Sequence, residues 1–533
     1  MSLFTAQLHP GRALGFLILG ASLHDVLTRL KAEPQRFPKL DVVYSPQRPV
    51  IEPICVVLPN NGIRLRFDGP EQRLRLIEII DFTKNHITFK DRHLMKPPAV
   101  ANNGVVPPSS PVPGESSLGP TFRHIYHRLL GPTYGGEFIP PSGTTGDGVY
   151  VLSYPGVAFN FALAESAYSP DKDVVSLLSA ASSQVATSMA VFSGASWAEA
   201  RNTLWTEPLP SIKQTSSVLP RTKDVYPDEV SLVRIHGGGR LELVRRSSPN
   251  NPMHIQLGET TPQDLVMELG PPNAIYRKHD QKMVIHKMRT ASTASRSRPS
   301  HGGLDGLRPD DLTDTDQSSM NTGSDSSDSE NNHHAIDEQT AADPPGECFY
   351  NYFHLGFDVL LSTHPSEPPP DSSSGNNSNP IKSHHPDRLV ATKLVLHGNI
   401  PGSYEFNRHR RCRWDIAYLF DSNQQHRQHQ EATTSETEFK IIGERMNSKL
   451  ANSSSATEYS TDGKPAQERQ RGMVLNRGWG DSPGSSCEFL GGWEESGARR
   501  LETVGDSTTT LFGFPGLVFE VLRNDYVNAV TVF

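Results

Sequence analysis

A Leu-Gly pair followed by a short amphipathic helix occurs three times along this chain, and strand-like segments follow each helix. The three pairs are Leu19-Gly20, Leu118-Gly119 and Leu257-Gly258. After each pair, apolar residues recur at the spacing that buries one face of a helix. The corresponding positions are Val26/Ile125/Leu265, Leu27/Tyr126/Val266 and Leu30/Leu129/Leu269. Self-similarity of this kind predicts a protein built of repeated units.

Capping and turn residues support these elements. Thr261 has the position of an N-cap, Pro262 that of the first helical residue, and Asp264 completes a capping box. Asn61-Gly62 and Pro155-Gly156 separate strand-like segments and favour hairpin turns. We therefore expect an α+β fold of three or four repeated units, each a short helix followed by antiparallel strands, with long disordered insertions.

The expected organisation follows the change in composition along the chain. Tracts rich in Ser, Asp, His and Pro are too poor in apolar residues to form a packed core, so we read them as disordered. The units expected are a first unit at 1–92, a Pro/Ser/Gly connector at 93–117, a second unit at 118–250, a third at 251–420 with disordered insertions at about 289–345 and 363–387, a disordered segment at 421–472, and C-terminal strands at 473–533 that form an incomplete fourth unit.

Charge and cysteine content exclude several classes of protein. The net charge of −8 and the pI near 6.2 argue against a general nucleic-acid binder. The four cysteines lie far apart without a CxxC pair, which indicates neither a disulfide scaffold nor a zinc module. No apolar run approaches the ~18 residues of a membrane span. Ala13–Leu23 reads as a strand entering the first helix rather than as a signal peptide. A cytoplasmic protein is expected.

Two short matches to hydrolase motifs do not combine into an active site. His236–Gly239 resembles an esterase oxyanion loop and Gly480–Gly484 a nucleophile elbow, but no histidine follows Ser482 as such hydrolases require. His409 and Cys412 have an HxxC spacing, for which a metal site is less favoured than ordinary surface histidine. Phosphate-binding glycine motifs are absent from the sequence. We expect a protein without enzymatic activity and without a cofactor.

Two charged segments suggest binding. The dense basic run follows a strand and is interleaved with Phe406 and Trp414; it consists of Arg408, Arg410, Arg411 and Arg413. Its alternatives are a solvated edge, a contact with an anionic surface such as phosphoinositide headgroups or with a protein partner, and a nuclear localisation signal. Ser324–Glu330 is either an acidic phosphorylation tract or a plain spacer.

The sequence resembles the phagosome assembly factor family over nearly all of its expected ordered segments. The matching motifs include Val43-Tyr44-Ser45, Asp81-Phe82-Thr83-Lys84, Pro155-Gly156-Val157-Ala158-Phe159, Phe349-Tyr350-Asn351-Tyr352-Phe353 and Val518-Phe519-Glu520-Val521. One departure is the Gly/Ser-rich stretch 478–500, where the family pattern has a Trp-led helix.

The resemblance implies a non-enzymatic regulator or adaptor of autophagy. It would act in complex with a β-propeller partner of the breast carcinoma amplified sequence type and associate with membranes through phosphoinositides. Recruitment from the cytoplasm to the phagophore assembly site is implied. The alternative is a Golgi-related vesicle-trafficking protein that binds anionic membranes directly.

Overall fold

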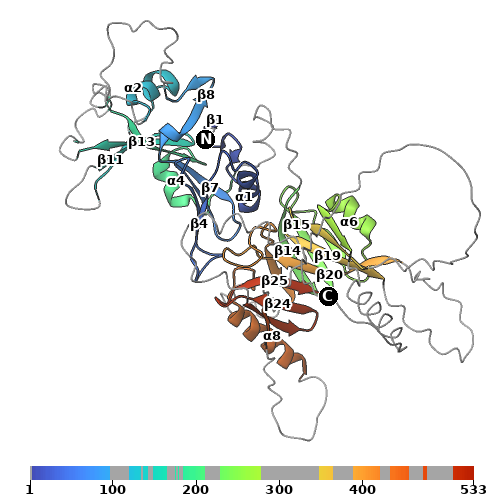
Figure 1. Cartoon of the computed structure of the whole chain (residues 1–533). Coiled ribbons are helices and arrows are strands. Elements are labelled where there is room, and N and C mark those ends of the chain that lie inside the picture. The colour runs from blue at the N-terminus through green and yellow to red at the C-terminus, as the bar shows by residue number, and fades with distance from the viewer. Residues whose placement is uncertain are drawn as a thin grey trace, which may run out of the picture.

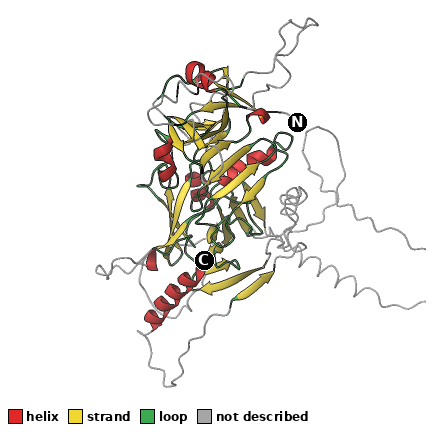
Figure 2. Cartoon of the chain, turned by 90° about the vertical axis from the view of Figure 1, so that its left-hand side faces the viewer, coloured by secondary structure: helices red, strands yellow, loops and turns green. Residues whose placement is uncertain are grey.

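Strands are the main secondary structure in the described part of the computed structural model, and they form four sheets (Figure 2). The structure describes residues 3–95, 119–133, 136–141, 148–164, 168, 175, 178, 184–209, 228–277, 347–363, 388–419, 432–454, 472–476 and 508–533. We refer to the described residues up to 209 as the N-terminal half and to those from 228 onward as the C-terminal half. The two halves lie beside each other and meet near the centre of the molecule (Figure 1).

The N-terminal half contains an eight-stranded sheet made of two four-stranded antiparallel meanders. The last strands of the two meanders, β7 and β13, pair with each other and so join the meanders into one sheet. The sheet order is β10 (Glu137–Ile139), β11 (Gly148–Tyr154), β12 (Val157–Leu163), β13 (Ala186–Phe192), β7 (Leu74–Ile79), β6 (Ile63–Phe67), β5 (Ile54–Leu58) and β4 (Asp41–Val43).

The C-terminal half contains a second eight-stranded sheet with the same plan. Its two meanders are again joined through their last strands, here β20 and β25. The sheet order is β17 (Ala274–Arg277), β18 (Cys348–Tyr352), β19 (Phe357–Thr363), β20 (Leu389–His397), β25 (Val527–Val532), β24 (Leu517–Val521), β23 (Thr508–Phe514) and β22 (Met473–Asn476).

Two smaller sheets flank the wide ones, and each contains one parallel pair, β1 with β8 and β14 with β21. The first sheet has the order β3 (Leu17–Ile18), β2 (Ala13–Leu14), β1 (Phe4–His9), β8 (Asn85–Phe89) and β9 (Arg92–His93). The second has the order β16 (Met253–Gln256), β15 (Arg240–Arg245), β14 (Val230–Gly237) and β21 (Trp414–Ile416).

Short helices cover parts of the sheets. The helices are α1 (Leu23–Ala32), η1 (Phe82–Lys84), α2 (Phe122–His124) continued by η2 (Ile125–Leu129), α4 (Trp197–Thr203), α6 (Pro262–Leu269), η4 (Ala417–Leu419) and α8 (Phe439–Ser454). Each half has its own large apolar core, and α1 contributes Val26, Leu27 and Leu30 to the first. Leu265 of α6 enters the second. A small cluster of Val50, Ile400 and Tyr526 packs the halves against each other.

The expected α+β fold of repeated helix–strand units is wrong. The described chain is mostly β, and strands from successive expected units share one sheet instead of forming a sheet for each helix. Sequence patterns predicted the strands, but they do not show which strand edges pair. In α6 the expected apolar stripe is also only partly buried, because Val266 is exposed and Leu265 alone is fully buried.

Several local predictions are confirmed. The capping box of Thr261 and Asp264 forms, and the hairpins at Asn61-Gly62 and Pro155-Gly156 have the expected strands on either side. Within the expected C-terminal strands at 473–533, residues 512–522 contain the end of β23, the whole of β24 and the turn between them. Most of the tracts at 289–345 and 363–387, and all of Ser324–Glu330, lie outside the described residues.

Helix α8 lies inside the segment 421–472 that the sequence was expected to leave disordered. Its buried residues Phe439, Ile442 and Met446 follow helical spacing, so a periodic signal was present and was outweighed by the polar composition around it. The helix begins on the β24–β25 turn, where the carboxylate of Asp525 accepts a hydrogen bond from the backbone N–H of Lys440 at 3.0 Å.

Leu27→Ala is expected to lower the free energy of unfolding by ~2–5 kcal/mol, because it empties a fully buried site between α1 and its sheet. Met267→Ala on α6 is the control, since 77% of Met267 is exposed and its removal leaves no cavity. Urea denaturation measures both. Equal stability of the two variants would contradict the packing described for α1.

Candidate functional site

The basic run, which we call the arginine segment (residues 408–413), lies in the loop that connects β20 to β21. Two backbone hydrogen bonds tie this loop to the second wide sheet: Arg410 N–H donates to Phe353 at 2.9 Å and Cys412 N–H donates to His397 at 2.9 Å. The loop faces the N-terminal half, and Gly402 sits so close to Tyr44 that a β-carbon there would collide with the phenol oxygen. The segment is therefore placed where the halves meet.

Arg410 is buried between acidic residues of both halves. Its guanidinium pairs with Asp25 of α1 and lies 3.1 Å from the carboxylate of Glu229, which precedes β14. Glu229 also pairs with Arg73 at 2.8 Å, so the charges alternate through the interior. Only 7% of the Arg410 side chain is exposed.

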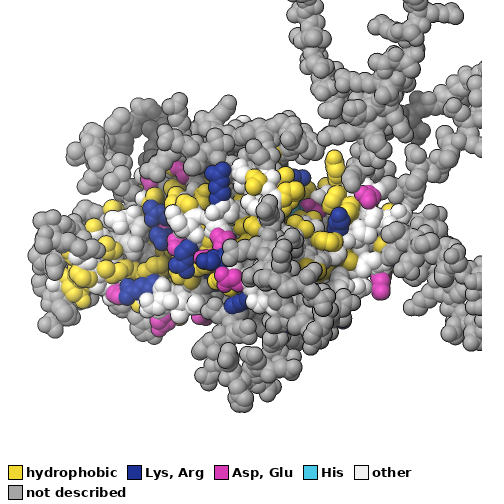
Figure 3. All heavy atoms as spheres, turned by 90° about the horizontal axis from the view of Figure 1, so that it is seen from below, with side chains coloured by type: hydrophobic (Ala, Val, Ile, Leu, Met, Phe, Trp, Pro, Cys, Tyr) yellow, Lys and Arg dark blue, Asp and Glu magenta, His cyan; other side chains and the backbone are white. Residues whose placement is uncertain are grey.

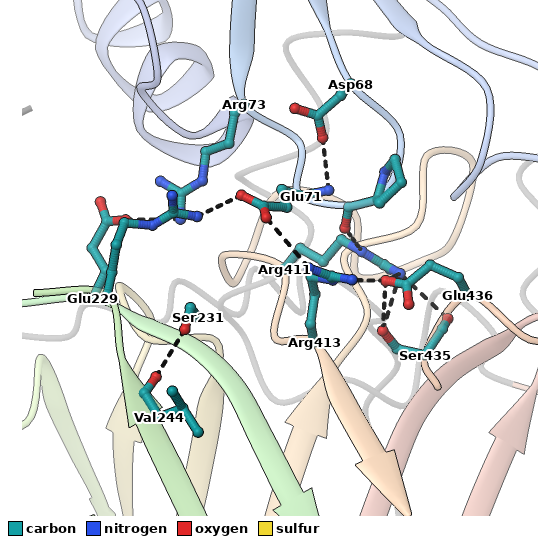
Figure 4. A network of polar contacts seen from close by, with 12 residues as sticks. Asp68, Glu71, Arg73, Glu229, Ser231, Val244, Arg411, Arg413, Ser435 and Glu436 are labelled. Atoms are coloured by element: carbon teal, nitrogen blue, oxygen red, sulfur yellow. Dashed lines mark hydrogen bonds and ion pairs between the residues drawn. The ribbon is translucent and has the colours of Figure 1, made fainter. Parts of the chain in front are cut away.

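Arg411 has the most enclosed side chain of the four arginines, with 1% of it exposed. Its guanidinium donates to the backbone carbonyls of Pro70 at 2.7 Å and Gly398 at 2.8 Å, and it pairs with Glu436 at 3.3 Å. Pro70 belongs to the N-terminal half, whereas Gly398 and Glu436 belong to the C-terminal half. Arg411 therefore bonds the halves directly (Figure 4).

Arg413 also forms ion pairs with both halves, whereas Arg408 does not. Arg413 pairs with Glu436 at 2.9 Å and, across the two halves, with Glu71 at 3.3 Å (Figure 4). Arg408 has 43% of its side chain exposed and lies 3.9 Å from Glu405. The structure thus brings three of the four predicted arginines into an internal network, which we call the junction.

The arginines of the junction lower the pKa values of its carboxylates. Burial raises the pKa of Glu436, but Arg411 and Arg413 outweigh it and hold that pKa at about 2. Burial likewise raises the pKa of Asp25, and the charge of Arg410 brings it far below its usual value. Burial also raises the pKa of Glu229, but the charges of Arg410 and Arg73 outweigh this effect and lower it. All three carboxylates are therefore ionised at neutral pH, as a buried network of arginines requires.

A second buried cluster lies next to the arginine segment. The carboxylate of Asp358 on β19 accepts hydrogen bonds from Nε2 of His397 at 2.9 Å and Nε2 of His409 at 3.1 Å. The two imidazole rings stack with centroids 3.7 Å apart and planes 10° apart. Glu405 lies 3.5 Å from Nδ1 of His397.

The two histidines of this cluster have pKa values shifted in opposite directions. Burial lowers the pKa of His397, but Asp358 and Glu405 outweigh it and raise that pKa to about 9. Burial and the positive charge of His397 lower the pKa of His409 to about 4. At neutral pH an imidazolium therefore stacks on a neutral imidazole, and the carboxylate of Asp358 accepts a hydrogen bond from each ring.

Two histidines and a carboxylate whose ligand atoms all lie within 4.8 Å of one another are a plausible donor set for a transition metal. The ring geometry does not fit this use. A metal binds an imidazole nitrogen along its lone pair, which lies in the ring plane. The lone pairs of these two stacked rings lie in separate, nearly parallel planes, so they do not converge on one point between the rings. The residues fit a hydrogen-bonded clamp that fixes the loop carrying the arginine segment.

The hydrolase-like motifs are not assembled into a site in the described chain. His236–Gly239 forms the end of β14 and the turn into β15, and Nε2 of His236 lies 3.0 Å from Glu242 on the neighbouring strand. Gly480–Gly484 lies outside the described residues. His409, considered for its HxxC spacing, contacts Asp358 through the hydrogen bond described above.

Sequence reasoning missed the acidic partners of the junction. Asp25, Glu71, Glu229 and Glu436 come from four separate segments of the sequence, and the first two lie 342 or more positions from the arginines that they pair with. Local charge patterning carries no signal for contacts over such separations. The one available hint was the density of arginines beside Phe406 and Trp414, which is compatible with burial as well as with exposure.

Comparisons with known proteins give a consistent result. A family model described as phagosome assembly factor 1 matches residues 13–301 and 381–533. A PHAF1 protein of Arabidopsis thaliana is 22% identical over 534 residues, which cover 99% of this chain and 92% of the relative. A PHAF1 protein of Drosophila melanogaster is 21% identical and covers 97% and 90%, respectively. No solved structure matches the chain.

Arg411→Gln is expected to destabilise the protein by ~3–5 kcal/mol, because it removes one of the two arginines paired with Glu436 and leaves the carbonyls of Pro70 and Gly398 without their charged donor. Arg408→Gln, at the exposed end of the same segment, is the matched control and should change stability by less than about 0.5 kcal/mol. Urea denaturation distinguishes them. Similar losses in both variants would exclude an internal role specific to Arg411.

The histidine cluster predicts a pH dependence. The raised pKa of His397 stabilises the fold fully below its unfolded value near 6.5, and this stabilisation is lost as pH rises through about 9. The lowered pKa of His409 acts in the opposite direction, so stability also falls as pH drops from 6.5 towards 4. The difference in unfolding free energy between wild type and Asp358→Asn should therefore be larger at pH 6.5 than at pH 9. A constant difference would contradict this assignment.

Proposed function

Because the chain belongs to the phagosome assembly factor 1 family, we propose that it is a non-enzymatic adaptor that acts at forming autophagosomes together with a β-propeller partner. The observation that carries this proposal is the junction, which holds two wide sheets in a fixed relation through buried ion pairs. A rigid body of this kind can present surfaces of both halves to different partners at once.

The charge distribution favours attachment to membranes through the partner. Arg410 and Arg411, which an anionic lipid headgroup would have to reach, are buried and already paired with carboxylates. On the face seen in Figure 3, basic and acidic side chains lie side by side in the middle of the described surface. A mixed surface gives a weaker attraction to anionic lipids than a continuous basic patch does.

A direct role at membranes, as in vesicle trafficking at the Golgi, is the second candidate function. It would have to use the more accessible arginines of the segment, Arg408 and Arg413. Within the described residues, no helix has both the length and the apolar character needed to cross a bilayer. Direct binding would then be peripheral and sensitive to salt.

Flotation with phosphoinositide-containing liposomes tests the two candidates. The purified full chain alone should remain in the soluble fraction, and it should float when a β-propeller protein recovered with it from source cells is added. The variant Arg408→Gln, whose side chain lies outside the junction, should float with the partner as wild type does. Flotation of the chain alone, weakened in this variant and lost at high salt, would instead support direct membrane binding.

A further inference from the structure

An apolar cavity of about 220 Å³ opens between helix α8, the β14–β15 turn and the ends of β24 and β25. It lies in the C-terminal half, and none of its lining residues takes part in the junction. Its wall includes Ile235, Gly238, Tyr418, Lys449, Leu450 and Val532.

The sequence keeps this space open. Gly237, Gly238 and Gly239 all have positive φ, and a β-carbon built on Gly238 would meet no atom within 4 Å. The turn therefore lines the cavity with backbone and sends no side chain into it. Because the cavity is open to solvent, an apolar occupant would displace water from its apolar wall, which is favourable.

The wall determines what kind of occupant fits. Ile235, Leu450 and Val532 make it apolar, and the hydroxyl of Tyr418 is turned towards the sulfur of Met446 at 3.6 Å. Lys449 is the one charged residue among those that the structure describes as lining the cavity. An apolar chain that ends in a negative group matches both features.

We propose that this cavity binds a medium-chain fatty acid, with the hydrocarbon chain inside and the carboxylate beside the ammonium group of Lys449. At about 30 Å³ for each group of the size of water or a methylene, the cavity holds about seven such groups. This is the length of the octanoate chain beyond its carboxylate. The proposal does not rest on the adaptor function.

A series of chain lengths tests the cavity directly. Hexanoate, heptanoate, octanoate, decanoate and dodecanoate are titrated into the purified full chain by isothermal calorimetry. Affinity should rise about fourfold for each added methylene up to octanoate and level off beyond it, because longer chains no longer fit inside. Absence of saturable binding, or an affinity that keeps rising through dodecanoate as it would on an open surface, would overturn the proposal.

Variants on α8 locate the site. Leu450→Trp fills the cavity and should abolish octanoate binding, whereas Ile441→Trp, at a position on the same helix that is 39% exposed and does not line the cavity, should bind as wild type does. Circular dichroism of both variants shows whether the fold is kept. Equal octanoate binding by folded Leu450→Trp would exclude this cavity as the site.

The role of Lys449 has its own test. Lys449→Gln should weaken octanoate binding about tenfold, the range for losing a hydrogen bond to a charged group, and leave the binding of uncharged octanol unchanged. Lys440→Gln, an exposed lysine of the same helix, is the control and should change neither. An equal loss for octanoate and octanol, or no loss for octanoate, would overturn the assignment of the carboxylate to Lys449.

Discussion

The buried ion pairs around Arg410 and Arg411 are the constraint on which the arrangement of the halves depends. A guanidinium can stay in the interior only when carboxylates and carbonyls replace the water it has lost. Asp25 and Pro70 supply such groups from the N-terminal half, and Glu229 and Glu436 supply them from the C-terminal half. The contacts must form together, because any one missing partner leaves a charge uncompensated. The halves therefore have one stable relative orientation.

The two wide sheets explain how the junction can be held so firmly. Each sheet joins two meanders through their last strands, so every meander contributes to a sheet much wider than the one it could form alone. Contacts within a meander are local in sequence, whereas the β7–β13 and β20–β25 pairs join distant segments. The loop with the arginines leaves β20, one of these joining strands, and the Asp358–His397–His409 cluster fixes its course. The loop, and with it the arginines of the junction, is thereby held in place on the sheet.

Asp25, Asp358 and Glu436, whose pKa values are strongly lowered, are paired within the protein and hold its parts together. The cavity beside α8 has an apolar wall with one lysine, which suits binding rather than acid–base chemistry. A fixed body with separate surfaces would suit the adaptor role proposed above, because binding at one surface then leaves the others in place.

The sequence alone determined the local elements and the family. Capping residues such as Thr261, turn pairs such as Pro155-Gly156 and alternating apolar residues predict helices, turns and strands because these depend on neighbours a few residues away. The motifs spread along the chain indicated the phagosome assembly factor family, which the comparison confirmed. Tertiary structure alone decided that the meanders merge into shared sheets, because the edges of β7 and β20 carry no local mark of their partners. It also decided that Arg410 and Arg411 are buried, since the burial of a charge depends on partners such as Asp25 and Pro70 that lie hundreds of residues away in sequence.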